Sequence, residues 1–158
     1  MALKKWIGRI HLWLGLTSGA LVVFLGITGC LLAFEKEIRY LTEPFRFVEK
    51  QNKPYLPPSQ LKAIAATQLN GQPVRMLEYG SKGRAAIAGY YDSVAYTIVA
   101  MNPYTGEVLK VKDMTKDFFR IVLKGHFYLW LPPAIGRPIV GSATLVFLIM
   151  LISGIVLW

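Results

Sequence analysis

Two long stretches without charged side chains enclose a mixed central region in this sequence. The first stretch covers residues 12–34 and the second covers residues 139–158. As helices with a rise of about 1.5 Å per residue they would reach about 35 Å and about 30 Å, and the hydrocarbon core of a bilayer is about 30 Å thick. The pattern predicts two transmembrane helices, at residues 12–34 and, counted from the boundary proline, at residues 138–158.

The region between them, residues 35–114, has the composition of a soluble domain. A helix is predicted over residues 60–69. The Pro-Pro-Ser sequence at residues 57–59 interrupts the preceding chain and supplies an N-cap, and Asn-Gly at residues 70–71 ends the helix. Between them, the apolar positions share one helix face. Four β-rich runs predict strands, at residues 74–79, 85–91, 94–101 and 107–111.

The last two strands are joined by a turn at residues 102–106, in which Pro103 fixes φ at the second position and Gly106 takes a positive φ. The predicted fold class is therefore an α+β membrane protein. Its two transmembrane helices flank a small domain with one helix on an antiparallel sheet.

An amphipathic helix is predicted at residues 115–131, between this domain and the second span. Its apolar stripe consists of Phe119, Val122, His126 and Trp130. Its charged residues occupy other faces, so the helix is expected to lie at the membrane interface.

Basic residues before the first span set the expected orientation. Lys4, Lys5 and Arg9 precede it without any acidic residue, and the positive-inside rule then places residues 1–11 in the cytoplasm and the central domain on the outer side. A competing interpretation is a lipoprotein signal cleaved before Cys30. Apolar residues continue past that position, so a retained helix is favoured, with Cys30 as a small buried residue.

Composition excludes several classes of protein. The chain has 158 residues, a formal net charge of +9 and one cysteine, which excludes an intrachain disulfide framework and a Cys-rich metal site. Nucleic-acid motifs are absent, so no nucleic-acid partner is expected, and the basic residues are expected to meet lipid headgroups or anionic ligands. The central domain has isolated carboxylates, expected to be solvated, and no catalytic motif, which favours binding over catalysis.

The two histidines of the chain, His11 and His126, each lie at a predicted membrane boundary. His11 begins a helix face rich in small residues, namely Gly15, Gly19, Val22, Gly26 and Gly29. This face favours close approach of another helix or of a flat ligand. The plainer alternatives are a glycine-faced helix contact for His11 and a hydrogen-bonded interfacial histidine for His126.

An imidazole in an apolar membrane cavity is also suited to axial ligation of haem iron. His11 and His126 lie at opposite ends of a span, on the order of 30 Å apart by helix rise, so they cannot ligate one iron. Each would serve a separate haem and would need a second ligand from another helix pair.

Three segments resemble the PepSY-associated transmembrane family. The sequence WIGRIHLWLGL at residues 6–16, followed by GITG at residues 26–29, is similar to the first span of the family. The second span of the family is similar to four further motifs of this chain, which are GHF at residues 125–127, GR at 136–137, VG at 140–141 and SGIVLW at 153–158. The sequence NPYTGEVL at residues 102–109 resembles the closing hairpin of a PepSY module.

The resemblance implies a bacterial inner-membrane protein with a periplasmic PepSY-like domain, related to haem-containing reductases that take iron from ferric siderophores. It makes His11 and His126 the candidate ligands of haem b. Arg120, Lys124 and Arg137 could then pair with haem propionates or an anionic chelate, or else contact membrane lipid. Such relatives continue into two further spans, so a homodimer or a second pair of helices is expected.

Two functions therefore remain open. The first is electron transfer across the membrane to a ferric siderophore or a related acceptor, with the hard chemistry supplied by the cofactor. The second is a non-catalytic membrane-anchored PepSY module that binds or regulates a periplasmic protein or peptidase, in which case both histidines are structural.

Overall fold

The computed structural model describes residues 2–157, with side chains in the terminal helices described from Lys5 and up to Ile155. The expectations for the side chains of Lys4 and Trp158 lie outside this range. The chain forms two compact units, Met1–Glu35 with Ile121–Trp158, called here the membrane unit, and Lys36–Arg120, called the central unit.

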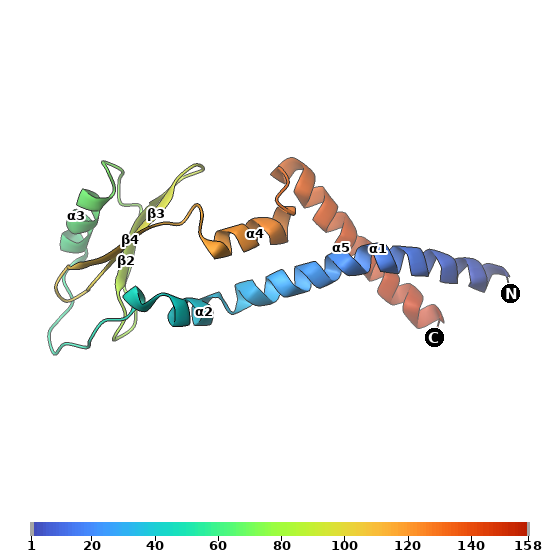
Figure 1. The fold of residues 1–158 in the computed structure, drawn as a ribbon, viewed down its shortest axis with the longest axis horizontal. Coiled ribbons are helices and arrows are strands. Elements are labelled where there is room, and N and C mark those ends of the chain that lie inside the picture. The colour runs from blue at the N-terminus through green and yellow to red at the C-terminus, as the bar shows by residue number, and fades with distance from the viewer. Residues whose placement is uncertain (1, 158) are drawn as a thin grey trace. The chain divides into compact units, whose positions relative to one another are not determined.

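The membrane unit contains two long helices and most of a shorter one. Helix α1 spans Ala2–Ala33, α4 spans Phe118–Tyr128 and α5 spans Pro133–Leu157 (Figure 1). Helix α5 begins before the expected boundary at Pro138, because Pro133 starts a helix favourably with its fixed φ. Pro138 is tolerated within the helix, where it removes one backbone hydrogen bond.

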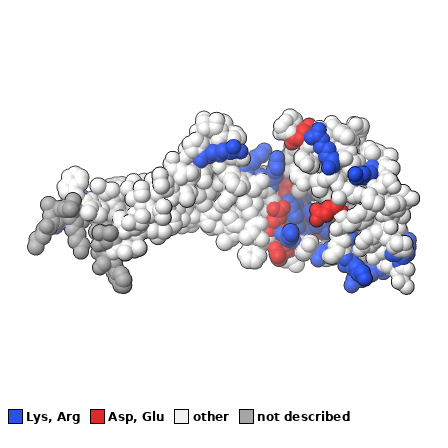
Figure 2. Space-filling model, turned by 180° about the vertical axis from the view of Figure 1, so that it is seen from behind, with Lys and Arg blue, Asp and Glu red and all other residues white. Residues whose placement is uncertain are grey.

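The two long helices carry the membrane character of the chain. By length and composition, Lys5–Ala33 and Pro133–Ile155 can each cross a membrane. In the most apolar stretch of each helix, only 11% and 6% of the residues are buried, respectively. The core helix of a soluble protein would be mostly buried, whereas exposed side chains such as Leu16, Val23 and Ile152 suit contact with lipid. On the face shown in Figure 2, charged residues gather over the central unit.

Helices α1 and α5 pack against each other in antiparallel directions. A Cβ at Gly15 would lie 2.9 Å from the Met150 methyl group, so this glycine permits close approach. In contrast, Cβ atoms at Gly19 and Gly26 would meet nothing within 4 Å. The expectation that Cys30 is buried is wrong, since it lies on the exposed side of α1. Only one face of α1 is covered by its neighbours.

The central unit is built on a four-stranded antiparallel sheet in the order β1-β2-β3-β4. Its strands are β1 (Met76–Glu78), β2 (Ala86–Tyr91), β3 (Tyr96–Met101) and β4 (Val108–Asp113). Helix α3 (Pro58–Gln68) packs on β2 and β3, as Figure 1 shows. Helix α2 (Glu35–Thr42) and the short 3-10 helix η1 (Pro44–Arg46) precede it. The α+β fold class predicted from the sequence is confirmed.

The core of this unit forms between α3 and one face of the sheet. Residues two apart on a strand share a face, so alternate positions of β2 and β3 point towards α3. This core consists of Leu61, Ala65, Leu69, Ala86, Ala88, Tyr90, Val99 and Met101. Ile98, on the opposite face of β3, is also buried, which agrees with the interior position of that strand.

Two turns match the sequence expectations and one helix start does not. Asn70 and Gly71 end α3 with φ of 50° and 82°, and Gly106 has φ of 78° in the turn before β4. Helix α3, however, begins at Pro58, with Pro57 as an N-cap residue that makes no side-chain hydrogen bond. The serine at residue 59 therefore lies inside the first turn and is not the N-cap.

Candidate functional site

His126 lies near the end of α4, where the chain folds back tightly. Leu129 and Trp130 have positive φ and end the helix, so Trp130 is not part of the helical stripe expected from the sequence. Its indole Nε1 donates to the Ile121 carbonyl at 3.0 Å, and its ring covers Gly125, where a Cβ would lie 2.6 Å from the indole. The Trp130 ring also meets Phe24 of α1 edge-on, with centroids 5.5 Å apart.

The imidazole of His126 is held against α1 by a hydroxyl and a glycine. Its Nδ1 lies 2.9 Å from Thr28 Oγ1, and its Cε1 would be 3.4 Å from a Cβ at Gly29. The Thr28 hydroxyl donates to the Phe24 carbonyl at 2.9 Å, so its only proton is used there. Thr28 Oγ1 is therefore placed to accept from His126 Nδ1–H, and in the neutral ring this tautomer leaves the lone pair on Nε2.

His11 is held in the same way at the other end of the helix pair. Its Nδ1 lies 2.8 Å from Ser153 Oγ on α5, and its Cε1 would be 3.6 Å from a Cβ at Gly154. The Ser153 hydroxyl donates to the Met150 carbonyl at 3.1 Å. By the same reasoning, Ser153 Oγ is placed to accept from His11 Nδ1–H, and in the neutral ring this tautomer leaves the lone pair on Nε2.

The two histidine sites share a chemistry but are far apart. Along α1, the 18 residues from His11 to Gly29 correspond to about 27 Å of helix. In the part of the chain that the structure describes, neither Nε2 atom has a hydrogen-bond partner. Each site thus holds a ring by its Nδ1 and leaves Nε2 open, and a metal-ligating histidine usually has its other ring nitrogen hydrogen-bonded in this way.

The surroundings of the His11 ring leave room for a flat ligand such as haem. An open groove of about 440 Å³ lies beside His11 and is lined mainly by apolar residues of α5, among them Met150 and Ile155. The open positions at Gly19 and Gly26 leave space along α1 for a flat ligand or another helix. Each site supplies one nitrogen donor, so the residues present fit one axial ligand per haem.

The three basic residues suggested by the sequence have different surroundings. Arg120 lies over the Tyr96 ring at 6.0 Å, and Lys124 is exposed on α4. Arg137 Nη2 donates to the Tyr128 hydroxyl at 3.2 Å, and its guanidinium lies 5.4 Å from the ring of that tyrosine.

A second polar cluster, which we call the ionic cluster, lies in the central unit. Lys112 Nζ donates to Glu43 Oε1 at 2.5 Å and to Asp117 Oδ2 at 2.6 Å. Arg39 also contacts both carboxylates, with 2.8 Å between Nη1 and Glu43 Oε1, and Arg46 donates to Glu43. Glu43 is 7% exposed, so the expectation that the carboxylates of the central domain are isolated and solvated is wrong for it. Asp117, which the sequence placed on a charged face of the interfacial helix, is 6% exposed.

The ionic cluster keeps these two carboxylates charged. Burial raises the pKa of Asp117, but hydrogen bonds from Arg39 and Lys112 outweigh it and lower the pKa to about 2. Burial likewise opposes ionisation of Glu43, and hydrogen bonds from Lys112 and Arg46 leave its pKa below the ordinary value. Asp117 also accepts from the Phe119 amide at 3.1 Å and so starts α4.

Sequence reasoning found both histidines but missed the groups that hold them. A signal was present, because Ile27-Thr28-Gly29 and Ile152-Ser153-Gly154 repeat the same pattern of isoleucine, hydroxyl and glycine in the two spans. The ionic cluster had no comparable signal, since its members are up to 78 residues apart along the chain.

The fold and the two long helices define a class, a membrane protein whose two apolar helices flank a small α+β unit. The family described as the PepSY-associated TM region matches residues 8–158, nearly the whole chain. The chain belongs to this family, as its sequence motifs predicted. Comparison with curated proteins gave no significant match.

Proposed function

We propose that this chain is a haem-binding protein of the bacterial inner membrane that carries electrons across the bilayer to a ferric siderophore or a related periplasmic acceptor. The observation that carries the proposal is the repeated arrangement of His11 and His126. Each ring donates from Nδ1 to a hydroxyl of a neighbouring helix and presents Nε2, with a glycine beside the ring.

This arrangement supports ligation better than a purely structural role. A histidine that only joined two helices would gain from hydrogen bonds at both ring nitrogens, whereas here the second nitrogen has no partner among the described residues. When bound, haem b would supply a one-electron iron couple whose potential depends on its axial ligands. The chain holds the two imidazoles and fixes their tautomers through Thr28 and Ser153.

Completion of each site needs a second helix pair. Only one histidine lies at each level of the membrane unit, about 27 Å apart along α1. The positions at Gly19 and Gly26 have no neighbour within 4 Å, so a helix from a second copy or from a further pair of spans can approach there. Arg120, Lys124 and Arg137 are the cations available on the His126 side for propionates or an anionic chelate.

The absorbance spectrum of the full chain tests the proposal. Protein produced in haem-replete cells and purified in detergent is expected to show a Soret band with the spectrum of low-spin iron with two imidazole ligands. His11→Ala and His126→Ala are each expected to remove part of this absorbance, because each removes one Nε2 donor, and the double variant is expected to remove all of it.

A matched pair of hydroxyl variants separates ligation from fold. Thr28→Val removes the acceptor of His126 Nδ1–H and is expected to shift the haem reduction potential without loss of absorbance. Thr17→Val is the control, since the Thr17 hydroxyl bonds only to carbonyls of its own helix, and no shift is expected. A colourless protein, or full absorbance in both alanine variants, would contradict the proposal and favour the membrane-anchored binding module.

A further inference from the structure

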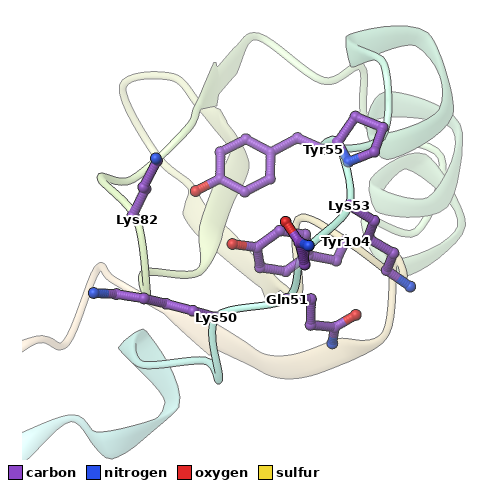
Figure 3. A pocket seen from close by; sticks show the side chains of 8 residues that line it. Lys50, Gln51, Lys53, Tyr55, Lys82 and Tyr104 are labelled. Atoms are coloured by element: carbon purple, nitrogen blue, oxygen red, sulfur yellow. The ribbon is translucent and has the colours of Figure 1, made fainter.

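An open cavity of about 720 Å³ lies in the central unit (Figure 3), and none of its lining residues belongs to the ionic cluster. Three of its eight lining residues are lysines, and none is acidic. The lining consists of Lys50, Gln51, Asn52, Lys53, Pro54, Tyr55, Lys82 and Tyr104. We call this cavity the lysine pocket.

The lysine pocket is built by three segments that the backbone ties together. The first of these segments is residues 48–56, which precede α3. At one end of this segment, the Val48 amide donates to the Gly83 carbonyl at 3.2 Å. At its other end, the Leu56 amide donates to the Pro103 carbonyl at 2.8 Å. This segment therefore runs between the turn that carries Lys82 and the turn that carries Tyr104, so the lysines are brought together by the fold.

Tyrosine rings form a rigid wall of the pocket. Tyr55 stacks on Tyr79 with centroids 5.7 Å apart and an angle of 7° between the rings. It meets Tyr104 edge-on at 4.8 Å. Figure 3 shows that the hydroxyls of Tyr55 and Tyr104 both point to the side of the pocket where Lys50 and Lys82 lie.

Although the Tyr104 hydroxyl lies near it, the hydroxyl of Tyr55 has no acceptor in ordinary hydrogen-bond geometry among the described residues. Its oxygen is buried and has no hydrogen-bond partner among the described residues, whereas the Tyr79 hydroxyl donates to the Leu56 carbonyl at 2.6 Å. Burial, with the nearby Tyr104 hydroxyl, raises the pKa of Tyr55, so the phenol keeps its proton. A buried polar group without a partner is costly, which indicates that a ligand satisfies it.

We propose that the lysine pocket binds an oxyanion, a phosphate or carboxylate group, through the ammonium groups of Lys50 and Lys82 and the Tyr55 hydroxyl. Several cations in a pocket without a carboxylate repel one another, and an anion removes this repulsion. The hydrogen bonds formed with an oxyanion are charge-assisted, which makes them stronger than neutral ones. The anion is carried by a soluble ligand or by a lipid headgroup, both of which offer the same oxygen atoms.

Calorimetric titration of the full chain tests this inference. In nanodiscs of phosphatidylcholine, pyrophosphate and citrate serve as soluble probes, and at least one is expected to bind saturably and more weakly as salt increases. Lys50→Gln with Lys82→Gln is expected to lower the affinity at least about tenfold, the size expected for losing charged hydrogen bonds. Lys62→Gln with Lys110→Gln removes the same charge from exposed lysines outside the pocket and is expected to leave affinity unchanged.

Tyr55→Phe gives a readout that a structural role would not produce. It removes a buried hydroxyl without a partner, so the affinity is expected to fall several-fold while the unfolding temperature stays equal or rises. A lower unfolding temperature with unchanged affinity would mean that the hydroxyl serves the fold alone.

The source of the anion follows from a second lipid composition. If phosphatidylglycerol in the nanodiscs weakens probe binding, and does not do so in the Lys50/Lys82 variant, a headgroup occupies the pocket. Unchanged probe binding identifies a soluble ligand. Absence of saturable binding of both probes in phosphatidylcholine nanodiscs overturns the inference, as does an equal loss of affinity in both lysine pairs. None of these outcomes depends on haem.

Discussion

At the scale of single residues, glycines decide how closely backbone segments approach around the histidines. Gly136, at the start of α5, lies against the backbone of Tyr128, where a Cβ would be 2.6 Å from the Tyr128 Cα. Gly125 contacts the Trp130 ring, where a side chain on residue 125 would collide with the indole. These two positions bring the end of α4 against the start of α5 and so set where His126 points.

Gly136→Ala is expected to destabilise the membrane unit by about 2 kcal/mol or more, because the new methyl group collides with backbone that cannot rotate away. The measurement is thermal unfolding of the full chain in detergent, followed by the near-ultraviolet circular dichroism of tryptophan. All four tryptophans lie outside residues 36–120, so this signal reports on the membrane unit.

Gly141→Ala is the matched control in the same helix. A Cβ at Gly141 meets nothing within 4 Å, and alanine has a higher helix propensity than glycine. The unfolding temperature of this variant is expected to stay equal or to rise. Equal losses in the two variants would show that any substitution in this helix is harmful and that the Tyr128 contact is not the cause.

At the scale of elements, the ionic cluster joins the two segments through which the chain enters and leaves the central unit. Arg39 lies on α2 and Glu43 follows it, while Lys112 lies on β4 and Asp117 starts α4. Breaking such a buried pair leaves an uncompensated charge, which typically costs about 3–5 kcal/mol. The cluster therefore fixes α2 against the end of β4.

Acid is expected to destabilise the central unit. The folded pKa of Asp117 is about 2, below its ordinary value of 3.8, so the stability it contributes is complete above about pH 4 and is lost as the pH falls towards 2. Asp92 has a pKa lowered in the same way to about 2, chiefly by the amides of Ala95 and Val94 and the Tyr90 hydroxyl. Asp117→Asn is therefore expected to weaken the pH dependence without abolishing it.

The tyrosine circular dichroism of the full chain measures this pH dependence, because seven of the eight tyrosines lie in residues 36–120. Asp113→Asn is a useful comparison, since Asp113 is exposed and its carboxylate accepts from Thr115 alone among the described hydrogen bonds. It is expected to change stability at neutral pH much less than Asp117→Asn. The same loss in both would show that the ionic cluster adds nothing beyond a surface charge.

At the scale of the whole molecule, the orientation of the chain is the main expectation to test. Lys5 and Arg9 precede the first span, and the positive-inside rule places them in the cytoplasm and the central unit in the periplasm. Cys30 is the only cysteine, so Cys30→Ser gives a background without thiols for labelling.

In that background, Lys62→Cys in the central unit is expected to react with a membrane-impermeant maleimide in intact spheroplasts. Lys5→Cys is expected to react only after permeabilisation, because the reagent does not cross the bilayer. Labelling of Lys5→Cys in intact spheroplasts, or protection of Lys62→Cys, would reverse the orientation and would move the lysine pocket to the cytoplasmic side.

The elements of this protein follow from local sequence. Hydrophobic length and the absence of charge determine the two long helices, and β-rich runs separated by turn residues such as Gly106 determine the strands of the sheet. The family follows from short motifs in a fixed order. These signals are local, because each depends on residues a few positions apart along the chain.

The contacts around the candidate site residues were decided by the tertiary structure. Ser153 contacts His11 across 142 positions of the chain, and Thr28 contacts His126 across 98 positions. In the ionic cluster, Lys112 contacts Glu43 across 69 positions. The lysine pocket likewise collects side chains from separate turns. Such contacts depend on how the elements pack, and the packing that brings them together leaves no periodic pattern in the sequence.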